Sequence, residues 1–94
     1  MRWIENITIY SAASIQNKKI IRLLNQFTHD ESYPSPEKIT IYRHSKLKNE
    51  LVILIYWEPE KQTIYKSTLG LQIAETLKEF GIINHYIWVE EKSF

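Results

Sequence analysis

The amino-acid sequence predicts an α+β fold of the ferredoxin-like type, with a four-stranded antiparallel sheet and two helices on one of its faces. Two observations carry this prediction. Four short segments are rich in strand-forming apolar residues, and two segments with apolar residues at helical spacing lie between the first and second strands and between the third and fourth. For the resulting β-α-β-β-α-β order, the simplest right-handed and unknotted arrangement places the first and third strands at the centre of the sheet.

The first strand and helix are predicted from the pattern of apolar residues. Residues 5–11 (ENITIYS) alternate isoleucine with threonine and tyrosine, which indicates a strand. Residues 14–27 (SIQNKKIIRLLNQF) have the spacing of an amphipathic helix, and Ser14 is its expected N-cap. The following polar stretch, residues 28–38, contains two prolines and is expected to be a loop.

A hairpin is predicted in the middle of the chain. Residues 38–44 (KITIYRH) alternate again, and residues 45–49 (SKLKN) are short enough to connect them to a strand over residues 49–58. That strand (NELVILIYWE) has seven consecutive apolar residues, whereas a sheet covered on one side alone should have a polar residue at every second position. The run of apolar residues therefore predicts that both faces of this strand are covered.

The last third of the chain gives the clearest helix. Residues 67–81 (STLGLQIAETLKEFG) carry one apolar stripe, with Ser67 or Thr68 as the N-cap and Gly81 as the expected left-handed C-cap. Residues 82–91 (IINHYIWVEE) form the fourth strand.

Composition indicates a globular protein and excludes several classes. The 94 residues are 44% apolar and 24% charged and are sufficient for a single domain over residues 1–94. There is no cysteine, so disulfides, thiol catalysis and cysteine-based zinc sites are excluded. The start of the chain has no signal-peptide pattern, and the longest uncharged apolar run is too short to span a membrane. We therefore expect a cytoplasmic protein that does not associate with membranes.

Side chains alternate across a strand, and each strand accordingly divides into two sets. One set is aliphatic and matches the apolar stripes of the helices, so it is expected to form the core. All four strands place an aromatic residue in the other set, on the face away from the helices. The aromatic residues and the amide of that face are Tyr10, Tyr42, Tyr56, Asn84, Tyr86 and Trp88.

Three hypotheses account for such a face. A homodimer can bury it by packing two sheets together. Such a dimer can also enclose a pocket for a small, mostly apolar or aromatic ligand. A monomer can instead stack nucleic-acid bases on an open sheet, but a net charge of +1 and the absence of a basic-glycine-aromatic pattern in the third strand argue against nucleic acid.

The three histidines give one candidate for proton transfer. His29 follows the first helix, where its cation would favour the helix C-terminus, and His44 is expected in solvent. His85 shares its side of the strand with Ile87 and is therefore expected to point toward the helices, either as a hydrogen-bonded structural histidine or as a general base. No carboxylate lies near it in the sequence, and no metal-binding motif is present.

Three features carry a family resemblance: the order of strands and helices, the doubly apolar third strand, and the final helix and strand over STLGLQIAETLKEFGIINHYIWVEE. In these features the chain resembles the dimeric α+β barrel superfamily, which includes antibiotic-biosynthesis-monooxygenase-like and stress-responsive barrel proteins. This resemblance covers nearly the whole chain as topology. It implies a homodimer with packed sheets and the aromatic face as the barrel interior. Members of this superfamily bind polycyclic or quinone-like aromatics there, some oxidise them without metal or flavin, and some bind haem; for this chain we expect no cofactor. The resemblance makes His85 a candidate for proton transfer and gives six candidate ligand contacts: Tyr10, Tyr42, Tyr56, Asn84, Tyr86 and Trp88.

Two functions remain open from the sequence. The first is a protein that binds a small apolar or aromatic ligand, with a cofactor-independent monooxygenase-like activity. The second is a non-enzymatic dimer with a structural or regulatory role, in which the aromatic residues serve only for packing. Whether the protein is an enzyme is left open, because a fold does not determine chemistry.

Overall fold

The computed structural model describes residues 2–60 and 62–94 and has the predicted order of elements. The elements are β1 (Trp3–Tyr10), α1 (Asn17–Thr28), β2 (Lys38–Arg43), β3 (Glu50–Trp57), α2 (Thr68–Leu77), the short 3-10 turn η1 (Lys78–Phe80) and β4 (Ile82–Val89).

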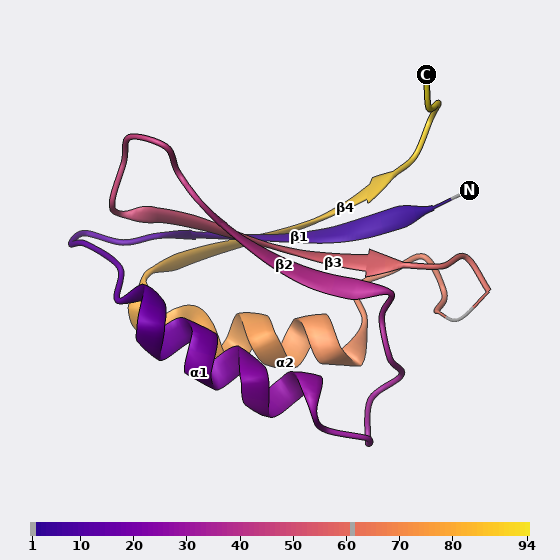
Figure 1. Ribbon diagram of the computed structural model, residues 1–94, viewed down its shortest axis with the longest axis horizontal. Coiled ribbons are helices and arrows are strands. Elements are labelled where there is room, and N and C mark those ends of the chain that lie inside the picture. Colours follow the sequence, from indigo (N-terminus) through magenta and orange to yellow (C-terminus); the bar gives the residue numbers. More distant parts are fainter. Residues whose placement is uncertain (1, 61) are drawn as a thin grey trace.

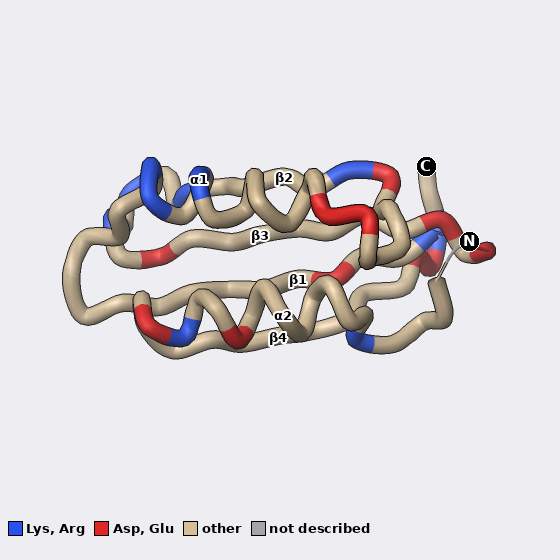
Figure 2. The backbone as a smooth tube through the Cα atoms, turned by 90° about the horizontal axis from the view of Figure 1, so that it is seen from below, with Lys and Arg blue, Asp and Glu red and all other residues tan. Residues whose placement is uncertain are grey.

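The sheet has the strand order β2-β3-β1-β4, and every neighbouring pair is antiparallel. The first and third strands are therefore central, as predicted. Both helices lie on one side of the sheet and leave the other side uncovered (Figure 1). Seen from the helical side, α1 lies along β2 and β3, and α2 lies along β1 and β4 (Figure 2). We call the side of the sheet without helices the open face.

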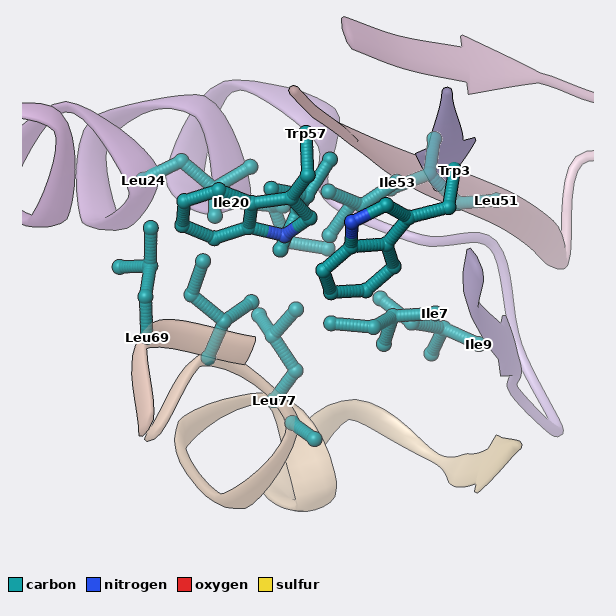
Figure 3. Close-up of a cluster of buried hydrophobic side chains, with 13 residues drawn as sticks. Trp3, Ile7, Ile9, Ile20, Leu24, Leu51, Ile53, Trp57, Leu69 and Leu77 are labelled. Carbon is teal, nitrogen blue, oxygen red and sulfur yellow. The ribbon is translucent and has the colours of Figure 1, made fainter. Parts of the chain in front are cut away.

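The core fills the layer between the helices and the sheet. Alternate residues of β1 and β3 point into it, and the two helices contribute their apolar stripes (Figure 3). At one end of this layer the indole rings of Trp3 and Trp57, which are register partners on β1 and β3, stack with centroids 5.9 Å apart. This pairing explains why β1 begins two residues earlier than predicted. The prediction that the aliphatic set faces the helices is confirmed.

The start of α1 was predicted wrongly, because its N-cap is Gln16 and not Ser14. The backbone N–H of Ser11 donates to the carbonyl of Asn49, and that of Ile15 donates to the carbonyl of Lys48. These two hydrogen bonds hold the chain against the β2–β3 connection. The backbone can become helical only after it leaves that connection.

The start of α2 was predicted correctly and its end was not. Ser67 is the N-cap, and its hydroxyl accepts a hydrogen bond from the N–H of Gly70 at 2.9 Å. At the other end, Gly81 has φ 160° and ψ −163°, which is extended backbone and not a left-handed cap. A Cβ at this position would lie 2.2 Å from the carbonyl oxygen of Tyr10. Gly81 is therefore needed for the close approach of two backbones.

No helix in the part of the chain that the structure describes is long and apolar enough to cross a membrane. Basic and acidic positions are interspersed over the molecule, with basic residues at the start of α1 and acidic residues in the connection from α1 to β2 (Figure 2).

Candidate functional site

The open face carries all of the predicted ligand-contacting residues. Strand alternation places them opposite the buried, helix-facing positions. Four of them are large aromatics with much of their surface exposed: Tyr10 (42%), Tyr42 (49%), Tyr86 (55%) and Trp88 (57%). Tyr56 and Asn84 are half-buried. The chain therefore presents an aromatic surface to its surroundings, as predicted.

The strand register arranges this face in rows across the sheet. Running from β2 through β3 and β1 to β4, the rows are Lys38–Tyr56–Ile4–Trp88, Thr40–Leu54–Asn6–Tyr86 and Tyr42–Val52–Thr8–Asn84, and Tyr10 lies between Glu50 and Ile82 in an end row. Most of the aromatics therefore stand toward the edges of the sheet, and shorter side chains occupy its centre.

Asn6 is a polar residue at the centre of the open face that the sequence reasoning did not select. Its side-chain oxygen accepts a hydrogen bond from the Thr8 hydroxyl at 2.8 Å. This bond orients the amide so that its N–H groups remain available as donors. The signal was present in the sequence, because Asn6 has the same alternation as Thr8 and Tyr10.

A hollow of about 360 Å³ lies at one end of the open face. Tyr56 and Trp88 line it on either side of Ile4, and the other four predicted residues lie outside it. Its wall is ordered by an ion pair between Arg2 and Glu37 at 2.8 Å. The structure therefore brings two of the six predicted residues into one concave site.

The electrostatics of this hollow centre on Tyr56. The Lys38 ammonium lies 4.5 Å from the centre of the Tyr56 ring, within the range of a cation–π interaction. Burial raises the pKa of the Tyr56 hydroxyl, and the Tyr42 hydroxyl raises it further through hydrogen bonding and charge repulsion. At neutral pH this hydroxyl is therefore a neutral group, which donates its one hydrogen to the Tyr42 hydroxyl and keeps its lone pairs as acceptors.

His85 lies on the other side of the sheet, as its alternation predicted. Its Nε2 is 2.7 Å from Oε2 of Glu5, and this contact is buried, with side-chain exposures of 6% for His85 and 0% for Glu5. Glu5 comes from the neighbouring strand β1, 80 positions away in the sequence. The carboxylate that orients His85 was therefore invisible to local sequence reasoning.

The carboxylate of Glu5 is held by donors from three elements. Oε1 accepts hydrogen bonds from Trp57 Nε1 at 2.8 Å and from the Ser67 backbone N–H at 3.2 Å, while Oε2 faces His85. A Cβ at residue 70 would lie 1.9 Å from Oε2, so Gly70 leaves the space that the carboxylate fills. A buried carboxylate is costly unless it is hydrogen-bonded, and this one is satisfied on both oxygens.

The other two histidines have structural surroundings. His44 Nδ1 accepts hydrogen bonds from the backbone N–H groups of Lys46 and Leu47, both at 3.0 Å, which orders the β2–β3 connection. His29 is exposed at the C-cap of α1. Within residues 2–60 and 62–94, no three histidine, aspartate or glutamate side chains are grouped as a metal site.

Comparison with known proteins identifies the fold. No family model matches the chain, and neither does any curated protein sequence. Among solved structures, two crystal structures of SnoaB, a cofactor-independent oxygenase from Streptomyces nogalater, match nearly the full length. This chain has the fold of SnoaB.

The match to a point variant of SnoaB has a TM-score of 0.65 at 13% identity and covers 98% of this chain and 94% of the other. The second SnoaB structure gives 0.62 at 14% identity and covers 98% and 93%. The predicted ferredoxin-like α+β architecture is thereby confirmed.

Proposed function

We propose that the protein is a homodimer that packs its two open faces together and binds a small, mostly apolar or aromatic ligand between them. The aromatic open face is the observation that carries this proposal. An apolar patch that extends over four strands is larger than soluble monomers usually expose, and two-fold association is the commonest way to bury a self-complementary surface.

The arrangement of side chains on the open face supports a pocket between the two copies. Tyr42, Tyr86 and Trp88 stand on the edge strands, whereas Asn6 and Thr8 occupy the central strand β1. When two such faces meet, the tall residues make contact first and the short ones leave space. A flat aromatic compound suits a space with aromatic walls.

Polar groups within this space would orient the ligand. The amide of Asn6 offers hydrogen-bond donors, and the neutral hydroxyl of Tyr56, whose hydrogen is directed to Tyr42, offers an acceptor. A few such groups among apolar walls are typical of small-molecule sites. A ligand with carbonyl or hydroxyl oxygens on an aromatic skeleton meets both requirements.

The proposed chemistry on this ligand is a cofactor-independent oxygenase-like reaction. Its support is the fold shared with SnoaB, which is described as a cofactor-independent oxygenase. The alternative, a non-enzymatic dimer in which the aromatic residues only pack, predicts a dry interface and no ligand. The two functions are separated by measuring ligand binding.

We expect Trp88→Phe to weaken binding of the apolar dye anilinonaphthalene sulfonate by about two- to tenfold, because the change removes the indole N–H and part of one aromatic wall. Dye fluorescence measures the affinity, and sedimentation velocity checks that the oligomeric state is unchanged. Tyr56→Ala should weaken the dimer itself, since it removes a half-buried aromatic ring of the central strand β3 from the proposed interface.

Tyr65→Ala is the matched control, because Tyr65 is an exposed aromatic outside the open face. Its affinity for the dye should equal that of the unmodified protein. Equal affinities for Trp88→Phe and the unmodified protein would contradict the pocket. If Trp88→Phe also abolished the dimer, the aromatic residues of the open face would be shown to serve for packing.

A further inference from the structure

A second hollow, of about 400 Å³, lies between α2 and the edge strand β4, and we call it the α2–β4 hollow. His85 lines it from the sheet. Lys66 lines it from the segment before α2, Glu75 from α2 itself, and Lys78 from the C-cap of α2. His85 faces the helical layer, while Asn84 and Tyr86 of the open face also line this hollow, so the hollow reaches the edge of that face at β4. It is lined by a titratable residue, is large enough for a small molecule and opens to solvent.

One nitrogen of His85 is available to this hollow. Nε2 is occupied by Glu5, and Nδ1 has no hydrogen-bond partner within residues 2–60 and 62–94. Among the fully enclosed side-chain nitrogen and oxygen atoms of the same part of the chain, Trp3 Nε1 is the one without a hydrogen-bond partner. His85 lines the hollow, and 6% of its side chain is exposed.

Glu5 determines which nitrogen of a neutral His85 can accept a proton. A carboxylate has only acceptor sites, so Nε2 must be the donor in the 2.7 Å contact. The neutral imidazole then carries its hydrogen on Nε2 and a lone pair on Nδ1. Trp57 and Ser67 hold the other carboxylate oxygen and so fix the direction of Oε2.

We propose that the α2–β4 hollow is a proton-transfer site in which Nδ1 of His85 is the general base and Glu5 is its positioning residue. The substrate class is a small compound with an acidic O–H or C–H bond, such as a phenol or an enolisable carbonyl compound. The proton passes from the substrate to Nδ1, and the bonding electrons stay on the substrate as an anion.

Charges around the hollow suit both products of this transfer. The imidazolium that forms is adjacent to the Glu5 carboxylate, and the substrate anion lies near the Lys66 and Lys78 ammonium groups. Glu75 is the other charged group lining the hollow, and it is paired with Lys78 at 2.7 Å. No electron acceptor or metal is required, because the step moves only a proton.

The test uses nitrobenzisoxazole, a carbon acid whose deprotonation opens its ring to a coloured cyano-nitrophenolate. The base removes the ring C–H proton, the electron pair forms the nitrile, and the N–O bond breaks to release the phenolate. A well-placed base accelerates a proton transfer by about 10²–10⁴-fold. Because this probe is not a natural substrate of the protein, we expect an effect at the low end of that range or below it. His85→Gln should lower the rate at a saturating concentration of the probe at least about tenfold.

Glu5→Gln tests the positioning role. The Gln oxygen is expected to keep the two donors from Trp57 and Ser67, which turns its NH₂ group toward His85 Nε2. Nε2 must then accept, so the imidazole hydrogen moves to Nδ1, which can no longer take a proton. We expect kcat to fall about as far as in His85→Gln with little change in KM.

His29→Gln is the control, because His29 is exposed at the C-cap of α1 and lines neither hollow. Its rate should equal that of the unmodified protein. The proposal is overturned if the unmodified protein is no faster than His85→Gln, if His29→Gln loses as much rate, or if Glu5→Gln remains folded and fully active. None of these outcomes decides whether the protein is a dimer.

Discussion

Glu5→Ala is expected to lower the free energy of unfolding by about 3–5 kcal/mol, because each buried donor left without an acceptor costs about 1–3 kcal/mol. The change leaves three donors without an acceptor: Trp57 Nε1, the Ser67 N–H and His85 Nε2. It also leaves a cavity in the layer between helices and sheet. Urea denaturation followed by tryptophan fluorescence measures the loss, because the indole of Trp57 contacts the missing carboxylate.

Glu5→Gln separates the hydrogen bonds from the charge. Glutamine has the same shape and can satisfy all three partners once His85 changes its tautomer, so we expect a loss of at most about 1.5 kcal/mol, the worth of an ordinary hydrogen bond. If glutamine were as destabilising as alanine, the negative charge and not the hydrogen bonding would hold the cluster together. A loss below about 1 kcal/mol for Glu5→Ala would contradict the buried cluster itself.

Gly70→Ala is expected to destabilise the protein by about 1–3 kcal/mol, the usual cost of overpacking a filled core. Alanine normally stabilises a helix interior by about 1 kcal/mol relative to glycine, so the expected sign is the opposite of that for an exposed helical position. The reason is the position of the new Cβ, 1.9 Å from Glu5 Oε2. The carboxylate cannot yield without breaking its hydrogen bonds.

A double-mutant cycle tests this explanation. In the Glu5→Ala background the obstacle is gone, and Gly70→Ala should become neutral or stabilising by up to about 1 kcal/mol. The coupling free energy between the two sites is then the measured quantity. Additive effects would show that Gly70 is required for a reason unrelated to Glu5.

The fold was predictable because each element carries its own periodic pattern. Alternation assigned the isoleucines of β1 and β3 to the core, and Ser67 marked the start of α2. The errors occurred where distant segments meet. Ser14 fails as a cap because the hairpin connection holds the preceding backbone, and Gly81 is required by the approach of Tyr10 and not by a left-handed turn. Neither contact has a local signature.

The candidate sites show the same division between local and distant information. Alternation correctly placed Tyr56 and Trp88 on one face and His85 on the other. Only the strand register shows that Tyr56 and Trp88 share a hollow. The partner of His85 is Glu5, whose charged side chain in an otherwise apolar, helix-facing position was the available signal. A charge in such a position predicts a buried partner, although the sequence does not say which residue it is.

The central claim is that a second copy of the chain covers the open face. Native mass spectrometry of the untagged protein tests it most directly, because one chain has a mass of 11.3 kDa. We predict a single species at twice that mass, together with additional mass wherever a ligand is retained between the sheets. A species that remains at 11.3 kDa across the micromolar range would contradict the claim and leave the aromatic face open to another partner.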